Sequence, residues 1–453
     1  MTNHSFNGEK SMFKRYFLSL AVLLAFLYCP VVFAAGSGGY RVEVPDAAAV
    51  GKGSAFTGEA NDPSAVYYNP AGMTQLKGNN LSLGLSIIQP KSDYVNGAGT
   101  IKNKMGRDSF LIPEGFFVTD LGTKDFALGL GAMSSWGLVT DWGQTSSLRY
   151  STTRAEIANQ DYLITTAYKV NDQFSLALGL DIDDSNVDKQ KKLQQGPAGV
   201  TAFDGNFKLK GSDTAAGFRI AGLYKLNDQN QFGLMYRSAI QHKYKGKIHL
   251  DGLNTNNVVD LNGDGTPESN YQGIFGGASY QTEVVSKATL PDSLVLGYSF
   301  KPTNKWTFNA DLEWMNWSVV NEEELAYPSE SDPSRLAVLN NGNPVARDWQ
   351  SVISAAVGAQ YDVSDRFRVR GGYYHHQSPV PGDNWEPNLP DTVSHGITTG
   401  FGYDIRKDLT LDLAWSGIYY MPRDIDNTVN GGNNNGTYKQ WTNLLYATMT
   451  YKF

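Results

Sequence analysis

The sequence predicts an all-β transmembrane protein: a closed antiparallel barrel of about 14 strands, plugged by a small N-terminal segment. Three observations support this fold class. The residues from Trp441 to Phe453 alternate between apolar and polar side chains and end on an aromatic residue. Comparable alternating segments recur from Asn80 onward, with joins that are alternately short and long. After Ala35 no apolar run is long enough for a membrane-spanning helix, which leaves strands to cross a bilayer.

Residues 1–34 are expected to form a secretory signal peptide. A short basic region precedes an apolar run from Phe17 to Val32, and small residues then lead to a cleavage site after Ala34 or Ala35. A membrane anchor is the alternative, but the run is short for a span and a proline interrupts its end. Cys29, the single cysteine, lies in this segment, so the mature chain is expected to have no disulfide and no cysteine metal site.

Residues 35–77 differ from the rest of the chain and are expected to form a hatch that plugs the barrel. Small residues dominate the segment, and it shows no sustained alternation. Short helical turns are expected around Asp46 to Val50 and Asn61 to Tyr67. A disordered leader is the alternative, although the Val, Tyr and Phe content favours a packed segment.

Residues 78–453 are expected to form the transmembrane barrel. Aliphatic and aromatic residues recur at every second position in successive segments, as in strands with one lipid-facing side. For the last segment, Trp441 to Phe453, taken alone, the alternative is a half-buried edge strand of a soluble sheet. Short joins are expected on the periplasmic side and long ones outside the cell. The expected long joins are Asp184 to Lys208, His249 to Ser286, Asn321 to Asp348, Ser378 to Asp391 and Pro422 to Tyr438.

Composition and charge exclude several classes of function. The formal net charge is -7, whereas a nucleic-acid-binding protein would present a basic surface. The histidines after the signal segment lie in no recognisable catalytic motif, so no enzyme activity, cofactor or metal is expected. The turn with Asp260, Asn262 and Asp264 resembles the start of a calcium loop. Tyr271 stands at the twelfth position, where such loops have Glu, and this favours a solvated turn.

Four separated motifs follow one another along the chain. They are Asn69-Pro70-Ala71-Gly72-Met73 at the end of the hatch, Leu290-Pro291-Asp292-Ser293 at the start of a strand, Trp314-Met315-Asn316-Trp317-Ser318, and Ser378-Pro379-Val380-Pro381 with Leu389-Pro390-Asp391. Together and in this order they resemble the FadL family, the outer-membrane transporters of long-chain fatty acids and other hydrophobic compounds. The similarity runs from about Gly36 to Phe453.

This resemblance implies specific structural features. The hatch lies in the lumen, and the third strand, expected from Phe126 to Asp141, carries an inward kink that opens a hole in the wall. Ser135, Trp136 and Gly137 are the residues expected at this lateral opening, since glycine tolerates a bend or bulge in a strand. The alternative is that Gly137 simply ends the strand before an external loop. Four residues are expected to tie the hatch to the wall and to take part in gating: Asn69, Pro70, Ala71 and Gly72.

The resemblance also implies a function in the bacterial outer membrane. The protein is expected to capture long-chain fatty acids or related hydrophobic compounds and to release them into the membrane by lateral diffusion. Burying each methylene group contributes about 0.8 kcal/mol, so a route that avoids water preserves this energy. Uptake of neutral hydrocarbons such as alkanes and monoaromatics is the alternative, and a general porin is disfavoured because a hatch blocks free diffusion. The expected partners are the hydrophobic ligand, outer-membrane lipids with lipopolysaccharide, and the barrel assembly machinery, around a monomeric protein.

The sequence leaves open where a carboxylate head group would bind. Near the positions where some relatives carry basic residues, this chain has Lys189, Lys191 and Lys192 at the outer end of a strand, and the acidic stretch Glu322 to Glu324. Period-two parity places other basic residues toward the lumen, and these are the candidate head-group contacts: Arg219, Arg237, Arg368 and Arg370. The alternative is that these arginines pair with inward carboxylates, namely Asp311, Glu313 and Asp412.

Overall fold

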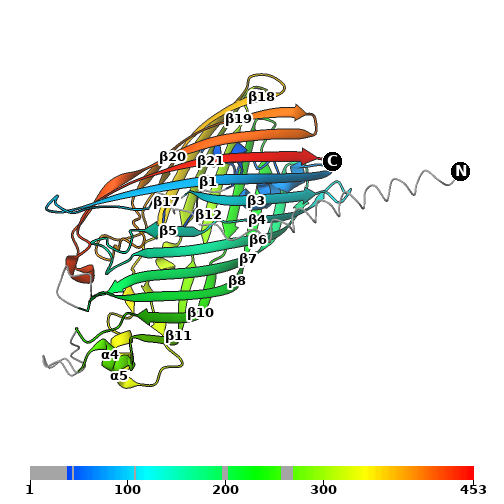
Figure 1. Ribbon diagram of the computed structural model, residues 1–453. Coiled ribbons are helices and arrows are strands. Elements are labelled where there is room, and N and C mark those ends of the chain that lie inside the picture. The colour runs from blue at the N-terminus through cyan, green and yellow to red at the C-terminus, as the bar shows by residue number, and fades with distance from the viewer. Residues whose placement is uncertain (1–37, 43–44, 107–108, 196–202, 257–268) are drawn as a thin grey trace.

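The computed structural model describes residues 38–42, 45–106, 109–195, 203–256 and 269–453, and the strands in it form one antiparallel barrel (Figure 1). In these ranges no helix has the length and apolar character needed to cross a membrane. The first strand, β1 (Asn79–Asn96), pairs with the last, β21 (Gly436–Lys452), along its whole length from Asn80 to Asn96. The sheet is therefore closed and has no free edge at this junction.

The barrel has 14 strands, which confirms the predicted fold class. Three of these strands consist of two segments with a short break between them: β4 (Phe126–Met133) with β5 (Gly137–Asp141), β9 (Asn230–Arg237) with β10 (Ile240–Asp251), and β11 (Ser279–Leu290) with β12 (Ser293–Phe300). The other strands, besides β1 and β21, are β3 (Phe110–Thr119), β6 (Arg154–Lys169), β7 (Phe174–Leu193), β8 (Gly205–Lys225), β13 (Trp306–Met315), β17 (Val352–Asp362), β18 (Phe367–His376), β19 (Ser394–Arg406) and β20 (Leu409–Ile425).

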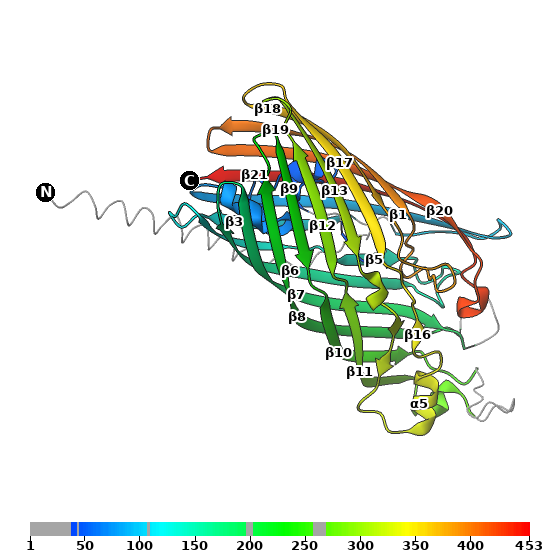
Figure 2. The same ribbon diagram turned by 180° about the vertical axis from the view of Figure 1, so that it is seen from behind.

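Shorter elements belong to the hatch and to the outer loops. They are α2 (Ala47–Val50), α3 (Ala65–Tyr68), η1 (Pro70–Gln75), β2 (Lys102–Lys104), α4 (Tyr271–Phe275), η3 (Trp317–Val319), β14 (Glu322–Glu323), β15 (Leu325–Ala326), α5 (Pro333–Leu339), β16 (Val345–Ala346) and η4 (Val429–Gly432). Figure 2 shows β10 and β11 continuing beyond β9 and β12 toward the end of the barrel that carries α5.

Side chains alternate between the lipid and the lumen along each strand, as predicted. On β7, Leu178 points outward and is 59% exposed, whereas Asp181 is 2% exposed and faces the lumen. On β18, Val369 points outward while Arg370 is buried. Apolar side chains thus cover the outer wall, and most charged groups of the membrane-spanning part face inward.

Several strands are longer than the sequence patterns indicate. The predicted joins Asp184 to Lys208 and His249 to Ser286 are wrong over much of their length, because β7 continues to Leu193, β8 begins at Gly205, β10 ends at Asp251 and β11 begins at Ser279. The apolar alternation stops where the outward face leaves the membrane and becomes polar. Backbone pairing continues beyond that level because ladder hydrogen bonds do not depend on apolar side chains.

The hatch segment lies inside the barrel. Its α2 contacts β19, β20 and β21, while its η1 contacts β4, β6, β7 and β8 on another part of the wall. Figure 1 shows these helical turns, in blue, between the front and back strands. The first expected turn agrees with α2, and the second begins later than expected, at Ala65, because Asp62 and Pro63 form the preceding turn. The signal peptide, its cleavage site and Cys29 fall outside the described residues and stay predictions, as do the proposed domain limits.

Candidate functional site

The third barrel strand is interrupted at the place predicted for a kink. β4 ends at Met133 and β5 begins at Gly137. Both segments pair with β6, but β3 pairs with β4 only from Thr119 opposite Leu128 to Gly115 opposite Ala132. In the described part of the chain, the stretch of β3 before Gly115 pairs with β1 and has no ladder partner on its other side. We call this discontinuity between β3 and β5 the interrupted seam.

Hydrogen bonds hold the chain at the break. The N–H of Ser135 and its Oγ both donate to Asp161 Oδ2, at 2.7 and 2.6 Å, and Gln160 Nε2 donates to the carbonyl of Met133 at 2.8 Å. Ser135 and Trp136 are 1% and 3% exposed, and Gly137 is also buried. The break therefore turns toward the lumen, and Gly137 opens a new segment instead of ending the strand.

The first described residues, 38–42, run along the break from the lumen side, and we call them the strap. Strap and break form an antiparallel bridge. In it the Val42 N–H donates to the carbonyl of Ser135 at 3.0 Å, and the Gly137 N–H donates to the carbonyl of Tyr40 at 2.8 Å. The N–H of Gly38 donates to Asp391 Oδ1 at 3.2 Å, in the loop between β18 and β19. The strap thus connects the interrupted seam to an outer loop.

An aromatic cluster packs around the strap at this level; it consists of Tyr40, Trp136, Trp317 and Trp349. Ring centroids lie 5.7 Å apart for Tyr40 and Trp317, 5.0 Å for Tyr40 and Trp349, and 5.7 Å for Trp136 and Trp317. Gly39 has a φ of +80° and approaches Trp317 so closely that a Cβ would lie 2.4 Å from the ring. A residue without a side chain is needed here both for the backbone angle and for the contact.

Asn69 connects the hatch to the barrel wall. Its Nδ2 donates to the carbonyl of Thr57 within the hatch at 2.9 Å and to the carbonyl of Gly222 on β8 at 3.1 Å. Its Oδ1 accepts from the N–H of Ala71 at 3.1 Å and so caps η1. One buried amide therefore organises the hatch turn and attaches it to a strand.

The rest of this motif is explained by local geometry. Pro70 starts η1, where its missing N–H has no cost. A Cβ on Gly72 would lie 2.2 Å from the carbonyl oxygen of Ala60, so the turn requires glycine at this position. All four predicted hatch residues are buried. Their position fits an anchoring role, while their part in gating stays a prediction.

A mainly apolar cavity of about 240 Å³ lies beside the strap, toward the outer end of the barrel. Its volume is just below the roughly 300–1,000 Å³ typical of small-molecule sites. A smaller cavity of about 20 Å³ shares Tyr40, Ile157 and Lys189 with it and extends to Leu138 of β5. The larger cavity is lined by apolar side chains that include Ile157, Val187, Leu209, Val284, Leu290 and Val320.

Charged residues form one end of this cavity. Lys189 of β7 makes an ion pair with Glu323, and Arg347 pairs with Glu323 at 2.7 Å and with Glu386 at 2.5 Å. Burial opposes ionisation of Glu323, but the charges of Lys189 and Arg347 outweigh it and hold the pKa of this carboxyl well below its usual value. The cavity therefore offers two cationic groups and a long apolar wall, the features that an amphipathic anion requires.

The sequence over residues 31–453 matches the family described as Outer membrane protein transport protein (OMPP1/FadL/TodX). The chain belongs to this family. The long-chain fatty acid transport protein of Escherichia coli K12 is 24% identical over 447 residues, covering 91% of this chain and 93% of that protein. The crystal structure of a Pseudomonas aeruginosa FadL homologue has a TM-score of 0.76 at 21% identity and covers 92% of this chain and 100% of its own. The Ralstonia pickettii toluene transporter TbuX has a TM-score of 0.65 at 17% identity, with coverages of 91% and 99%.

FadL-family membership makes this protein an outer-membrane transporter of hydrophobic compounds, as the motifs predicted. The family comprises transporters and channels. Within the described ranges, no group of three or more His, Cys, Asp or Glu side chains is placed to hold a metal ion. The calcium-like turn at Asp260, Asn262 and Asp264 falls outside those ranges.

The arginines predicted as head-group contacts in this FadL-family barrel all have acidic neighbours. Arg219 donates to both carboxylate oxygens of Asp181 at 2.6 Å. Its Nη1 also donates to the backbone carbonyls of Val66 and Tyr67 in the hatch. Arg370 pairs with Asp412 at 2.6 Å, as the alternative interpretation predicted. Arg368 pairs with Asp404, and Arg237 lies 3.7 Å from Asp181. Their contact with a ligand stays a prediction.

The other two carboxylates predicted as partners of these arginines bind the hatch instead. Asp311 Oδ2 accepts from the N–H groups of Phe56 and Thr57 at 3.0 and 2.9 Å, and Glu313 makes an ion pair with Arg41 of the strap. The lumen charges therefore hold the hatch and strap as well as one another. This explains why a protein of this family keeps so many ionisable groups inside a membrane barrel.

Sequence reasoning missed the cationic end of the cavity. Lys189 is one of three lysines near the positions where some relatives carry basic residues, but it is not among the four candidate head-group contacts, and Arg347 lies in an expected loop without any pattern of its own. One signal was present: the acidic run Glu322 to Glu324 requires nearby cations if it is buried. Which cations these are depends on contacts between β7 and the loop after β13, and no local pattern specifies such contacts.

Proposed function

We propose that this FadL-family transporter takes up long-chain fatty acids or closely related amphipathic acids. The observation that carries the proposal is the apolar cavity with Lys189 and Arg347 at one end. An alkyl chain would lie along the apolar wall, and the carboxylate would replace part of the contacts that Glu323 now makes with the two cations. The name of the Escherichia coli relative agrees with this substrate class.

Transport requires a route out of the cavity. Tyr40 of the strap lines this cavity and Arg41 of the strap lines a smaller cavity beside the hatch, and strap and aromatic cluster both touch the interrupted seam. We propose that displacement of the strap lets the ligand pass Ser135, Trp136 and Gly137 into the outer membrane. This route avoids water, so the ligand keeps the burial energy of its chain. Gating by the hatch, through Asn69 to Gly72, is the step expected on the periplasmic side.

The test compares ligands with and without a charged head. Lys189→Met and Arg347→Met should raise the Kd of detergent-solubilised protein for palmitate about tenfold to a hundredfold, since hydrogen bonds to charged groups contribute on the order of 1.5–3 kcal/mol. The Kd for hexadecanol should stay within about twofold. Lys192→Met is the matched control, because Lys192 lies on the outward side of β7 and donates to Asn206 at 2.6 Å. Equal losses for the acid and the alcohol would contradict a head-group site.

Uptake of neutral hydrocarbons is the second candidate, and one observation favours it. Lys189 and Arg347 are already neutralised by Glu323 and Glu386 and require no anionic ligand. The name of the Ralstonia pickettii structure refers to toluene. In this case hexadecane or toluene would bind at least as tightly as palmitate, and Lys189→Met would leave every Kd unchanged. Calorimetry with the same ligand set decides between the two candidates.

A further inference from the structure

Lysines crowd the outward face of three neighbouring strands, β8, β10 and β11. This is unexpected in a chain whose formal net charge is -7. Five of these six residues are exposed, and the side chain of Lys210, for example, is 63% accessible. We call this group the lysine patch; it consists of Lys208, Lys210, Lys243, Lys245, Lys247 and Lys287.

Strand register places like charges of the lysine patch opposite one another. Lys243 faces Lys287 across the β10–β11 ladder, and Lys247 faces Lys210 across the β10–β8 ladder. Directly opposed like charges destabilise an antiparallel sheet. Lys210 and Lys247 have acidic neighbours within the protein, so it is the Lys243–Lys287 pair that requires an anion from outside.

Acidic side chains of the protein compensate one part of the lysine patch. Asp188 lies 3.6 Å from Lys208 and 3.2 Å from Lys210, and Glu283 is the register partner of Lys247. Among the residues that the structure describes, no acidic side chain forms an ion pair with the remaining three lysines, which we call the lysine triad: Lys243, Lys245 and Lys287.

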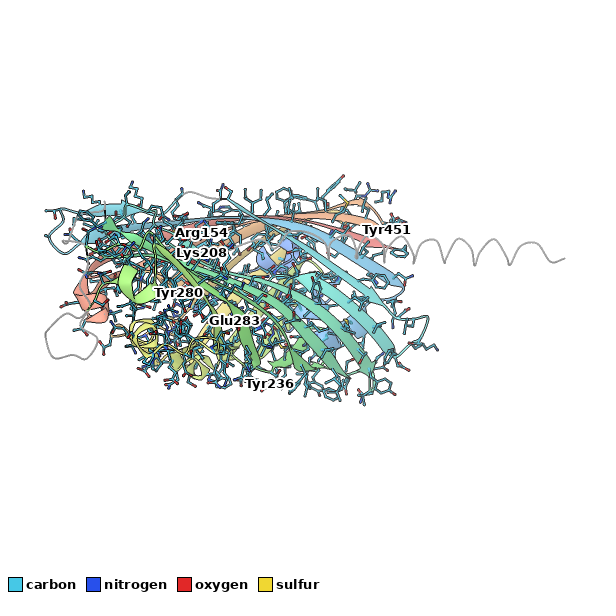
Figure 3. The ribbon with its side chains drawn as sticks, turned by 60° about the horizontal axis from the view of Figure 1, so that its bottom comes forward. Arg154, Lys208, Tyr236, Tyr280, Glu283 and Tyr451 are labelled. Carbon is cyan, nitrogen blue, oxygen red and sulfur yellow. The ribbon has the colours of Figure 1, made fainter. Side chains whose placement is uncertain are left out.

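The lysine triad lies outward of the lipid-facing surface, toward the outer end of the barrel. Tyr236, Leu294 and Trp314 share one row across β9, β12 and β13, and outward aromatic residues mark the membrane interface. Lys243 and Lys287 follow on the outer continuations of these strands, on the order of 15–20 Å further along the barrel. Along the wall in Figure 3, Lys208 lies nearest the outer end of the barrel, Glu283 comes next and Tyr236 lies furthest from that end.

We propose that the lysine triad binds the phosphate groups of lipopolysaccharide in the outer leaflet. The protein resides in the outer membrane, and the triad lies on the outer part of the wall, where phosphorylated sugars of an outer-leaflet lipid would surround it. A flexible row of ammonium groups suits several phosphates of varied spacing, because lysine acts as a mobile point charge. Lys243 and Lys245 point away from the lumen, whereas Lys287 also borders the cavity described above.

The test uses the full-length mature protein in detergent and purified lipopolysaccharide. The triple variant K243Q/K245Q/K287Q should bind it about tenfold or more weakly in microscale thermophoresis. The charge-preserving K243R/K245R/K287R variant should bind like the wild type. The matched control is K124Q/K305Q/K407Q, which removes the same charge from exposed positions in the short turns. Enzymatically dephosphorylated lipopolysaccharide should bind equally weakly to the wild type and the triple variant.

Two results would overturn the proposal. One is wild-type affinity of the triple variant for intact lipopolysaccharide. The other is an equal loss of affinity by the control variant, which would mean that net charge alone sets binding. Heat-modifiable electrophoresis checks that each variant is folded, and Lys245→Glu alone repeats the test with a single surface change.

Discussion

Two seams of this barrel wall are built in opposite ways. The seam between β1 and β21 is continuous, with register partners from Asn80 and Lys452 to Asn96 and Gly436. At the interrupted seam, β3 forms a ladder with β4 only. After the break, β5 pairs with β6 and not with β3. In lipid every backbone N–H and C=O needs a partner, so a ladder that stops must be replaced by something else.

The replacements come from the lumen. Asp161 holds the backbone and side chain of Ser135, and the strap supplies a second strand to the break. A continuous ladder can open only by unfolding the barrel, whereas these substitutes can separate while all other strands stay paired. We therefore predict that the interrupted seam is the part of the wall that moves.

The largest effect is expected from damage to the continuous seam. The N–H of Phe453 donates to the carbonyl of Asn79 at 2.9 Å, and the N–H of Asn79 donates back at 3.1 Å. Removal of Phe453 or Phe453→Ser should lower the folded, heat-modifiable fraction in outer membranes by about tenfold, because barrels must close to satisfy their edges. The neighbouring Lys452→Gln is the control, and normal levels of the Phe453 variants would contradict the prediction.

The next effect concerns passage through the interrupted seam. Gly137→Val should crowd the contact with Tyr40 and favour regular extended geometry, since a β-branched residue is stiff at χ1. Uptake of the hydrophobic ligand by cells should fall about tenfold, while binding to the purified protein stays near normal. Gly97→Val is the control, because a Cβ at Gly97 meets nothing within 4 Å. A joint loss of binding and uptake would place Gly137 in the pocket or in folding, and no change would exclude this exit.

A smaller effect is expected from the strap. Gly39→Ala combines an unfavourable φ of +80° with a Cβ that would lie 2.4 Å from Trp317, so the strap should move away from the aromatic cluster. Positive φ costs a residue with a side chain on the order of 1 kcal/mol or more. Single-channel recordings in planar bilayers should then show longer or more frequent openings. Gly382→Ala, in open space, should not change them. Unchanged conductance of Gly39→Ala would separate the strap from gating.

The smallest effect is a dependence of strap closure on pH. Burial raises the pKa of Asp391 to about 6 from 3.8, against hydrogen bonds from Ser378 and the strap backbone. The strap N–H groups donate to this carboxylate and lower its pKa, so the strap contact is strongest when Asp391 is ionised and weakens as the pH falls through 6.

Open probability should therefore rise by up to about tenfold as the pH falls from 7 to 4, since one pKa unit corresponds to about 1.4 kcal/mol. Asp391→Asn cannot ionise and should remove this dependence. The measurement is the same bilayer recording at a series of pH values. A rise of similar size in the Asn variant would assign the effect to other groups.

The sequence by itself determined the architecture of this protein. Period-two alternation, alternating join lengths and four ordered motifs were enough for a barrel of 14 strands, its family and its membrane. Even the break near Ser135 to Gly137 was predicted, through the resemblance, at the right place on the third strand. These features are local, because lipid on one side and a lumen on the other impose a repeated pattern on every strand.

Tertiary structure alone decided the interior chemistry. Arg219, Arg237, Arg368 and Arg370 face the lumen as parity indicated, yet the groups beside them, and the pairing of Lys189 with Glu323, depend on which distant strands and loops the closed barrel brings together. The contact between the strap and the interrupted seam has the same origin. Alternation specifies which side of the wall a residue faces, whereas its partner across the lumen follows from closure of the barrel and the packing of the hatch inside it.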